Sequence, residues 1–191
     1  MDQATMDEAR EDRESVSDWS AHTEAGIEAH SKLKYTEAEL QFAAALRMAE
    51  KWAGAESLAA LEKAEQDEVY DRLAKSLNNM AALYHSQGKY KMAEDLYNRC
   101  LEIKMKLYGE DHLEVALNLH NLAAVHSAKG RWAMAEPLYQ RSLELREKAL
   151  GADHHDLVPI LKNYALMLRR AKRDEEAELM EARAKHLSQP I

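Results

Sequence analysis

Residues 75–116 read KSLNNMAALYHSQGKYKMAEDLYNRCLEIKMKLYGEDHLEVA, and residues 117–158 continue as LNLHNLAAVHSAKGRWAMAEPLYQRSLELREKALGADHHDLV. Aligned at an offset of 42, the two stretches place Asn79 on Asn121, Ala81 on Ala123, Gly88 on Gly130, Tyr97 on Tyr139 and Gly109 on Gly151. Repetition at a fixed period of this length is typical of a fold that stacks copies of one small unit. We therefore interpret the rest of the chain repeat by repeat.

The repeat weakens toward both ends of the chain. A further step by the same offset reaches Asn163 and Ala165, but Lys172 then stands in place of the glycine. Upstream, residues 34–39 match residues 89–94 at an offset of 55. We predict four units, two of them clear and two degenerate, because terminal repeats must present a polar outer face.

Each recurring residue type has a mechanical role in a pair of helices. Helix-forming residues dominate the sequence, which favours helix throughout and argues against any sheet. The recurring alanines allow the two helices of a pair to approach closely, and Gly88 and Gly130 supply the left-handed conformation that ends the first helix. Tyr97 and Tyr139, which share one repeat position, fill the space between successive pairs. Asp111 and Asp153 are placed to cap the following helices.

The repeat resembles the tetratricopeptide repeat, in the longer form, with a period of 42, that kinesin light chains carry. Residues 77–84, 87–90, 93–97 and 108–112 carry the resemblance, and residues 119–124, 129–132, 135–139 and 150–154 carry it again. The resemblance implies an all-α fold, a right-handed superhelical solenoid of about four antiparallel helix pairs without β-sheet. It also implies a concave groove that is lined by the first helix of every pair.

The predicted organisation has three parts. Residues 2–18 hold seven acidic side chains against Arg10 and Arg13, so we expect residues 1–17 to form an acidic, flexible segment. Residues 188–191 form a short tail. The repeat domain covers residues 18–187, with pairs at about 18–54, 56–109, 112–151 and 154–187.

An insertion separates the first and second pairs. The offset of 55 leaves 13 additional residues, which fall within Ser57–Arg72. This stretch contains neither Gly nor Pro, so it predicts a first helix of the second pair over residues 56–87, or a helix broken near residues 65–68. The insertion is either a simple spacer or a second contact surface, for example for self-association.

Several polar side chains map to the predicted groove. Asn79, Asn121 and Asn163 share one repeat position and would form a ladder of amides for a partner's backbone; alternatively, they only bridge neighbouring helices. The basic residues Lys75, Lys162, Arg169 and Arg170 map to the same helices, and similarity to kinesin light chains implies that they bind an acidic partner segment. Alternatively, they are ordinary solvated charges. The predicted peptide-groove residues are Lys75, Asn78, Asn79, Asn121, Lys162, Asn163 and Arg169, with Arg170 at the edge.

Composition excludes several function classes. The formal net charge is −8, with no basic face suited to nucleic acid. No apolar run is long enough to span a membrane, and the single Cys100 allows no disulfide framework within one chain. We expect a cytoplasmic protein that neither binds nucleic acid nor inserts into a membrane.

Catalysis and metal binding are not expected. Residues 153–156, Asp-His-His-Asp, resemble the metal-binding string of certain phosphoesterases, but Asp153 and His154 recur as Asp111 and His112, which indicates a capping turn of the repeat. We predict a non-catalytic adaptor without cofactor that binds a partner's acidic segment, extended or in a short helix, in its groove. The alternative is a structural subunit or assembly factor that binds through its convex face, its ends or the helix over residues 56–87, with self-association.

Overall fold

The computed structural model describes residues 3–54, 58–59 and 61–188, with side chains from Val16 onward. All regular elements in these ranges are helices, which confirms the all-α prediction, and no strand occurs among them. The chain divides into two compact units, residues 1–103 and residues 104–191, and the boundary falls within helix α5 (Tyr90–Tyr108).

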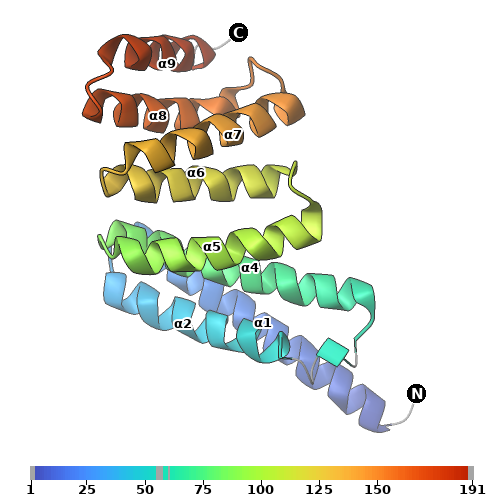
Figure 1. Ribbon diagram of the computed structural model, residues 1–191. Coiled ribbons are helices and arrows are strands. Elements are labelled where there is room, and N and C mark those ends of the chain that lie inside the picture. Colours follow the sequence, from blue (N-terminus) through green and yellow to red (C-terminus); the bar gives the residue numbers. More distant parts are fainter. Residues whose placement is uncertain (1–2, 55–57, 60, 189–191) are drawn as a thin grey trace. The chain divides into compact units, whose positions relative to one another are not determined.

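The first unit begins with a helical hairpin on which a third helix packs (Figure 1). Its helices are α1 (Gln3–Ser31), α2 (Tyr35–Trp52), α4 (Lys63–Ser86) and the start of α5. Trp19 from α1 packs with Ala45, Ala49, Leu77 and Cys100. The indole Nε1 of Trp19 also donates a hydrogen bond to Ser76 Oγ at 2.9 Å, so the first helices of two successive pairs are joined by a buried polar contact.

The second unit contains two helical hairpins, α6 with α7 and α8 with α9 (Figure 1). Its elements are the end of α5, α6 (Leu113–Ala128), α7 (Trp132–Leu150), the 3-10 helix η1 (His155–Leu157), α8 (Val158–Arg170) and α9 (Asp174–Leu187). Ala123 and Ala165 are buried in one core cluster, as suits small residues between closely packed helices. The rings of Tyr139 and Tyr164 stack with their centroids 5.4 Å apart and fill the space between the two pairs.

The turns inside the helical pairs use a left-handed residue, as the sequence predicts. Gly88 has φ of 73° and Gly130 has φ of 70°. The degenerate outer pairs keep this geometry without glycine, since Leu33 has φ of 58° and Lys172 has φ of 60° at the corresponding positions. The backbone geometry of the turn is thus retained where its usual residue is lost.

A buried hydrogen bond recurs between the helices of two pairs. Cys100 Sγ donates to the Ala74 carbonyl at 3.2 Å, and Ser142 Oγ, one repeat later, donates to the Ala116 carbonyl at 2.6 Å. Cys100 is fully buried. Its thiol therefore serves as a small packing group.

The predicted continuous helix over residues 56–87 is wrong. Leu58 and Ala59 are helical, Leu61 and Glu62 are not, and α4 begins only at Lys63. Residues 55–57 and 60 lie outside the described residues. Glu62 and Glu65 form a reciprocal capping box, so the new helix start is chemically defined.

Residues 63–72 of the insertion belong to α4, and the described residues before them pack against the start of this helix. Gln66 Nε2 donates to the carbonyls of Leu58 and Leu61, at 3.2 and 3.0 Å. Leu58 itself is buried. The break lies a few residues before the predicted alternative at residues 65–68.

The ends of the chain differ from the predicted boundaries. Helix α1 starts at Gln3, well before residue 18 where the first pair was expected. The mobility expected for residues 1–17 stays a prediction, and residues 1–2 lie outside the described part, as do residues 189–191 of the tail. No described helix combines the length and apolar character that a membrane crossing requires.

Candidate protein-interaction face

The predicted groove residues are divided between the two units. Lys75, Asn78 and Asn79 lie on α4 in the first unit, whereas Asn121 lies on α6 and Asn163 on α8 in the second. The amide ladder would therefore have to run across both units, and it stays a prediction. Within the second unit, α6 and α8 are the first helices of neighbouring pairs and contact each other directly.

On α4, Lys75 forms an ion pair within its own helix. Its Nζ lies 2.6 Å from Asp71 Oδ2, one turn earlier, and more than half of the Lys75 side chain is exposed. An exposed pair of this kind contributes little to stability. Lys75 is therefore accessible, although its charge is partly balanced by Asp71.

Arg169 is hydrogen-bonded to the neighbouring helix, α9. Its guanidinium donates to both carboxylate oxygens of Glu181 on α9, at 2.8 and 2.7 Å, and lies 3.4 Å from Asp174. The hydrogen bonds to Glu181 raise the pKa of Arg169 further above its usual value. This bidentate pair joins α8 to α9, so Arg169 stabilises its own hairpin and offers a partner a largely neutralised group.

The outward face of α8 carries positive charge that its own unit does not neutralise. Lys162, Leu166 and Arg170 follow one another at intervals of four residues and are all exposed, with Leu166 at 49%. In the described part of the chain, neither Lys162 nor Arg170 forms an ion pair with an acidic side chain. Two cations thus flank an exposed apolar side chain on a single helix face, which we call the α8 face (Lys162, Asn163, Leu166 and Arg170).

A buried histidine orients Asn163. The amide Nδ2 of Asn163 lies 2.7 Å from Nε2 of His120 on α6. Burial, followed by the nearby charge of Arg146, lowers the pKa of His120 to about 4, so its ring is neutral near pH 7 and accepts this hydrogen bond. Asn163 therefore bridges two neighbouring helices, as the alternative interpretation predicted, while its side-chain oxygen remains available as an acceptor.

Sequence reasoning missed a recurring set of arginines. Arg99, Arg141 and Arg183 lie one repeat apart from each other, and each reaches an acidic residue earlier in the chain: Glu50 at 2.9 Å, Asp111 at 2.5 Å and Glu147 at 2.5 Å. The period of 42 alone would have identified the three arginines as a recurring position of the repeat. Glu50 and Glu147 share one repeat position, which Met105 occupies in the pair between them, and Arg141 pairs with Asp111 instead.

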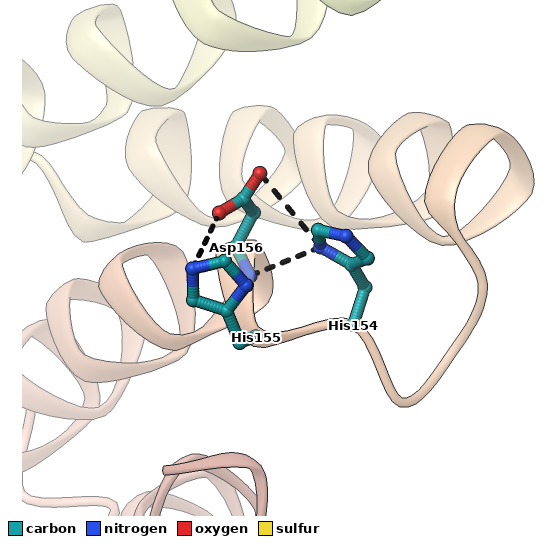
Figure 2. Close-up of side chains that lie close together, drawn as sticks. All are labelled: His154, His155 and Asp156. Atoms are coloured by element: carbon teal, nitrogen blue, oxygen red, sulfur yellow. Dashed lines mark hydrogen bonds and ion pairs between the residues drawn. The ribbon is translucent and has the colours of Figure 1, made fainter.

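The turn before α8 shows that the predicted cap was assigned to the wrong residue (Figure 2). The imidazole Nδ1 of His154 accepts a hydrogen bond from the Asp156 backbone amide at 3.2 Å. In the preceding repeat, Nδ1 of His112 accepts from the Glu114 amide at 3.1 Å. Asp111 instead pairs with Arg141 and Lys148, and the hydrogen bond from Lys148 lowers the pKa of the Asp111 carboxyl. The capping turn is real, but histidine provides its acceptor.

Two solved structures resemble the fold at low sequence identity. The crystal structure of BtubC (BKLC) from P. vanneervenii matches with a TM-score of 0.60 at 17% identity and covers 93% of this chain and 74% of that one. The crystal structure of a Podosopora anserina putative kinesin light chain with nearly identical TPR-like repeats matches with a TM-score of 0.54 at 15% identity, covering 87% and 93%. Comparison with curated proteins gives no significant sequence match.

The family assignment rests on the sequence itself. The tetratricopeptide-repeat family matches residues 72–145 and 115–185, which together span more than half of the chain. Proteins built from these repeats serve as interaction modules, so this chain is a protein–protein interaction scaffold. With its period of 42 and its structural likeness to a kinesin-light-chain repeat protein, the chain belongs to the tetratricopeptide-repeat family and carries repeats of the kinesin-light-chain-like type.

Proposed function

We propose that this protein is a non-catalytic adaptor that binds an extended, acidic segment of a partner protein along α6 and α8. The observation that supports this most strongly is the α8 face, where Lys162 and Arg170 carry unneutralised charge in a chain of net charge −8. A general excess of acid repels acidic partners, so a local positive face selects where such a partner binds. The single buried Cys100 fits a reducing compartment such as the cytoplasm.

The spacing of the α8 face defines the partner segment. Lys162 and Arg170 are eight residues apart, which corresponds to about 12 Å along a helix. An extended peptide covers this distance in about four residues, at roughly 3.3 Å per residue. The preferred segment therefore has two acidic residues about four positions apart, with an apolar residue between them that contacts Leu166.

Side-chain amides on the same helices suit the backbone of an extended segment. Asn163 has its amide nitrogen engaged by His120, so its oxygen would accept a backbone N–H of the partner. Asn121 on the adjacent helix α6 is only partly buried and would continue this recognition. Each net hydrogen bond of this kind contributes about 0.5–1.5 kcal/mol.

The proposal is tested with a displayed library of random peptides selected on the full-length protein. Recovered peptides should carry the pattern acid, apolar, acid described above. Lys162→Glu combined with Arg170→Glu should weaken binding of a recovered peptide by at least about tenfold, because attraction becomes repulsion at both ends. The matched control is Lys106→Glu combined with Lys185→Glu, which changes the net charge equally at exposed positions elsewhere.

A second variant separates binding from folding. Asn121→Ala should reduce peptide affinity while the melting temperature changes little, since the Asn121 side chain is only partly buried. If the α8 double variant binds as the control does, the acidic-segment proposal fails. If Asn121→Ala loses stability in proportion to affinity, the amide serves the fold instead.

A structural subunit is the second candidate function. It is favoured by the first helical pair, where Leu33 is 70% exposed and Leu40 is 64% exposed. Large apolar side chains this accessible are suited to contact with another protein. If this pair mediates assembly, Leu33→Ser combined with Leu40→Ser should shift the sedimentation coefficient of a complex to that of the monomer. An unchanged coefficient would remove this candidate.

A further inference from the structure

Three metal-ligating side chains converge in the turn between α7 and α8 (Figure 2). His155 Nε2 lies 3.1 Å from Asp156 Oδ1, and His154 Nδ1 lies 3.7 Å from Asp156 Oδ2. The two imidazole rings have their centroids 5.2 Å apart. One ligand atom from each of the three residues falls within a group no wider than 4.8 Å.

The repeat provides an internal comparison for this cluster. The preceding capping turn is formed by His112, Leu113 and Glu114, and it makes the same hydrogen bond from the backbone to the first histidine. Leu113 is partly buried, whereas the His155 side chain is 80% exposed. The turn therefore forms without a second histidine, and His155 adds a ligand that the cap does not need.

We propose that His154, His155 and Asp156 form a binding site for one divalent first-row transition ion such as Zn²⁺. Imidazole nitrogens and a carboxylate oxygen suit this class of ion. Ligands about 2.1 Å from a tetrahedral ion lie roughly 3.4 Å from one another. His155 Nε2 and His154 Nδ1 lie near this distance, at 3.1 and 3.7 Å, from different oxygens of Asp156, so side-chain rotation must bring both nitrogens to the one oxygen that binds the ion.

The remaining adjustment falls on the two histidines. His154 and His155 must approach each other slightly, which an exposed ring allows by rotation of its side chain. Binding through Nδ1 of His154 also competes with the hydrogen bond from the Asp156 amide. Water completes the coordination sphere, because all three side chains are at least partly exposed.

Arg146 is the nearby charge that opposes the ion. Its guanidinium donates to the Asp156 backbone carbonyl at 3.3 Å, and burial lowers the pKa of Arg146 below its usual value. The guanidinium contacts the backbone of Asp156, while the carboxylate is directed to the histidines. The site therefore retains its anionic ligand, at an affinity reduced by the arginine.

Titration of Zn²⁺ into the full-length protein by calorimetry tests this proposal. The informative variant is His155→Leu, which reproduces the preceding repeat and removes one ligand without disturbing the cap. His186→Gln serves as the control, because His186 is an exposed histidine on α9. Circular dichroism before each titration establishes that every variant is folded.

We expect about one Zn²⁺ per chain, bound at least about tenfold more weakly by His155→Leu and by Asp156→Asn, with His186→Gln unchanged. Line broadening of the His154 and His155 ring signals in the presence of Co²⁺ should locate the ion independently. Absence of saturable binding by the wild type would overturn the site. Equal affinity of wild type and His155→Leu would overturn it as well.

Discussion

At the level of single residues, two turns adopt a left-handed conformation without glycine. Leu33 and Lys172 occupy the positions that Gly88 and Gly130 hold in the central pairs. A side chain in this conformation destabilises the folded state by about 1–2 kcal/mol. Glycine avoids this strain, but its greater backbone entropy in the unfolded chain offsets about 0.5–1 kcal/mol of the gain. Leu33→Gly and Lys172→Gly should therefore each raise the free energy of unfolding by about 0.5–1 kcal/mol.

Urea denaturation measures this effect, and Gly88→Ala provides the opposite change. A Cβ atom at Gly88 would meet no atom within 4 Å, so only backbone strain is introduced there. Gly88→Ala should lower the free energy of unfolding by about 1 kcal/mol. A Leu33→Gly protein with a lower urea midpoint than the wild type would show that Leu33 makes a contact that outweighs its strain.

A second residue-level prediction concerns pH. The pKa of His120 is about 4 in the folded protein, against about 6.5 in an unfolded chain, so protons bind preferentially to the unfolded state. This contribution to stability is fully present above pH 6.5 and is lost as the pH falls toward 4. The total is on the order of 3 kcal/mol. Its physical cause is the burial of the neutral ring beside Asn163.

The measurement compares unfolding free energies at pH 7 and pH 4.5 for the wild type and for His120→Gln. Carboxylates contribute equally to both proteins, so the difference between the two slopes isolates the histidine. Gln keeps a polar side chain at position 120 without a titrating ring. Identical pH dependence of both proteins would contradict the buried, neutral state of His120.

Sequence reasoning succeeded for residues whose role is intrinsic to the repeat. A recurring glycine or small alanine has one geometric function, so Gly88 and Ala123 could be interpreted from period and residue type alone. The prediction of the capping residue failed because a histidine ring can accept the same hydrogen bond as a carboxylate, and because Asp111 and His112 are adjacent in the sequence. The bond from Arg169 to Glu181 could not be predicted, since it depends on the side-chain conformations of two helices.

At the level of helices, the first pair depends on one close contact. Gly26 of α1 takes the repeat position of Ala81 and Ala123, and a Cβ atom placed on Gly26 would lie 2.5 Å from the Phe42 ring on α2. Gly26→Ala should therefore destabilise the protein by about 1–3 kcal/mol through overpacking. Thermal denaturation measures the change.

A second substitution tests whether the contact is the cause. Phe42→Leu removes the ring that the new Cβ atom would meet. The double variant Gly26→Ala with Phe42→Leu should therefore lose less stability than the sum of the losses in the two single variants. Strict additivity would mean that Gly26 is required for another reason. A stabilised Gly26→Ala protein would show that α1 and α2 separate at little cost, because alanine favours helix intrinsically.

The inserted stretch shows the limit of helix propensity. Residues 57–72 contain only residues that helices tolerate, and propensity therefore favoured one long helix. The structure breaks at Leu61 and Glu62 because the Glu62–Glu65 capping box and the bonds of Gln66 satisfy the backbone groups that a break exposes. These contacts join residues three to eight apart, and a window of propensities does not weigh them.

At the level of the whole molecule, charge distribution supports the proposed function. The chain is acidic overall, yet internal ion pairs engage several of its arginines, including Arg169 and Arg173. The Arg173 guanidinium lowers the pKa of the Glu136 carboxyl to which it is bonded across two pairs. Lys162 and Arg170 also remain outside this network within the described residues, and they differ from other exposed cations in flanking the exposed Leu166 on one helix face.

The central claim is that the α8 face recognises acidic residues of a partner segment, and a charge swap tests it most directly. Dissociation constants are measured for an acidic peptide selected on the wild-type protein and for its counterpart with both acids changed to Lys. The account predicts that the wild type prefers the acidic peptide and that Lys162→Glu with Arg170→Glu prefers the lysine peptide. An unchanged preference for the acidic peptide in the double variant would contradict it.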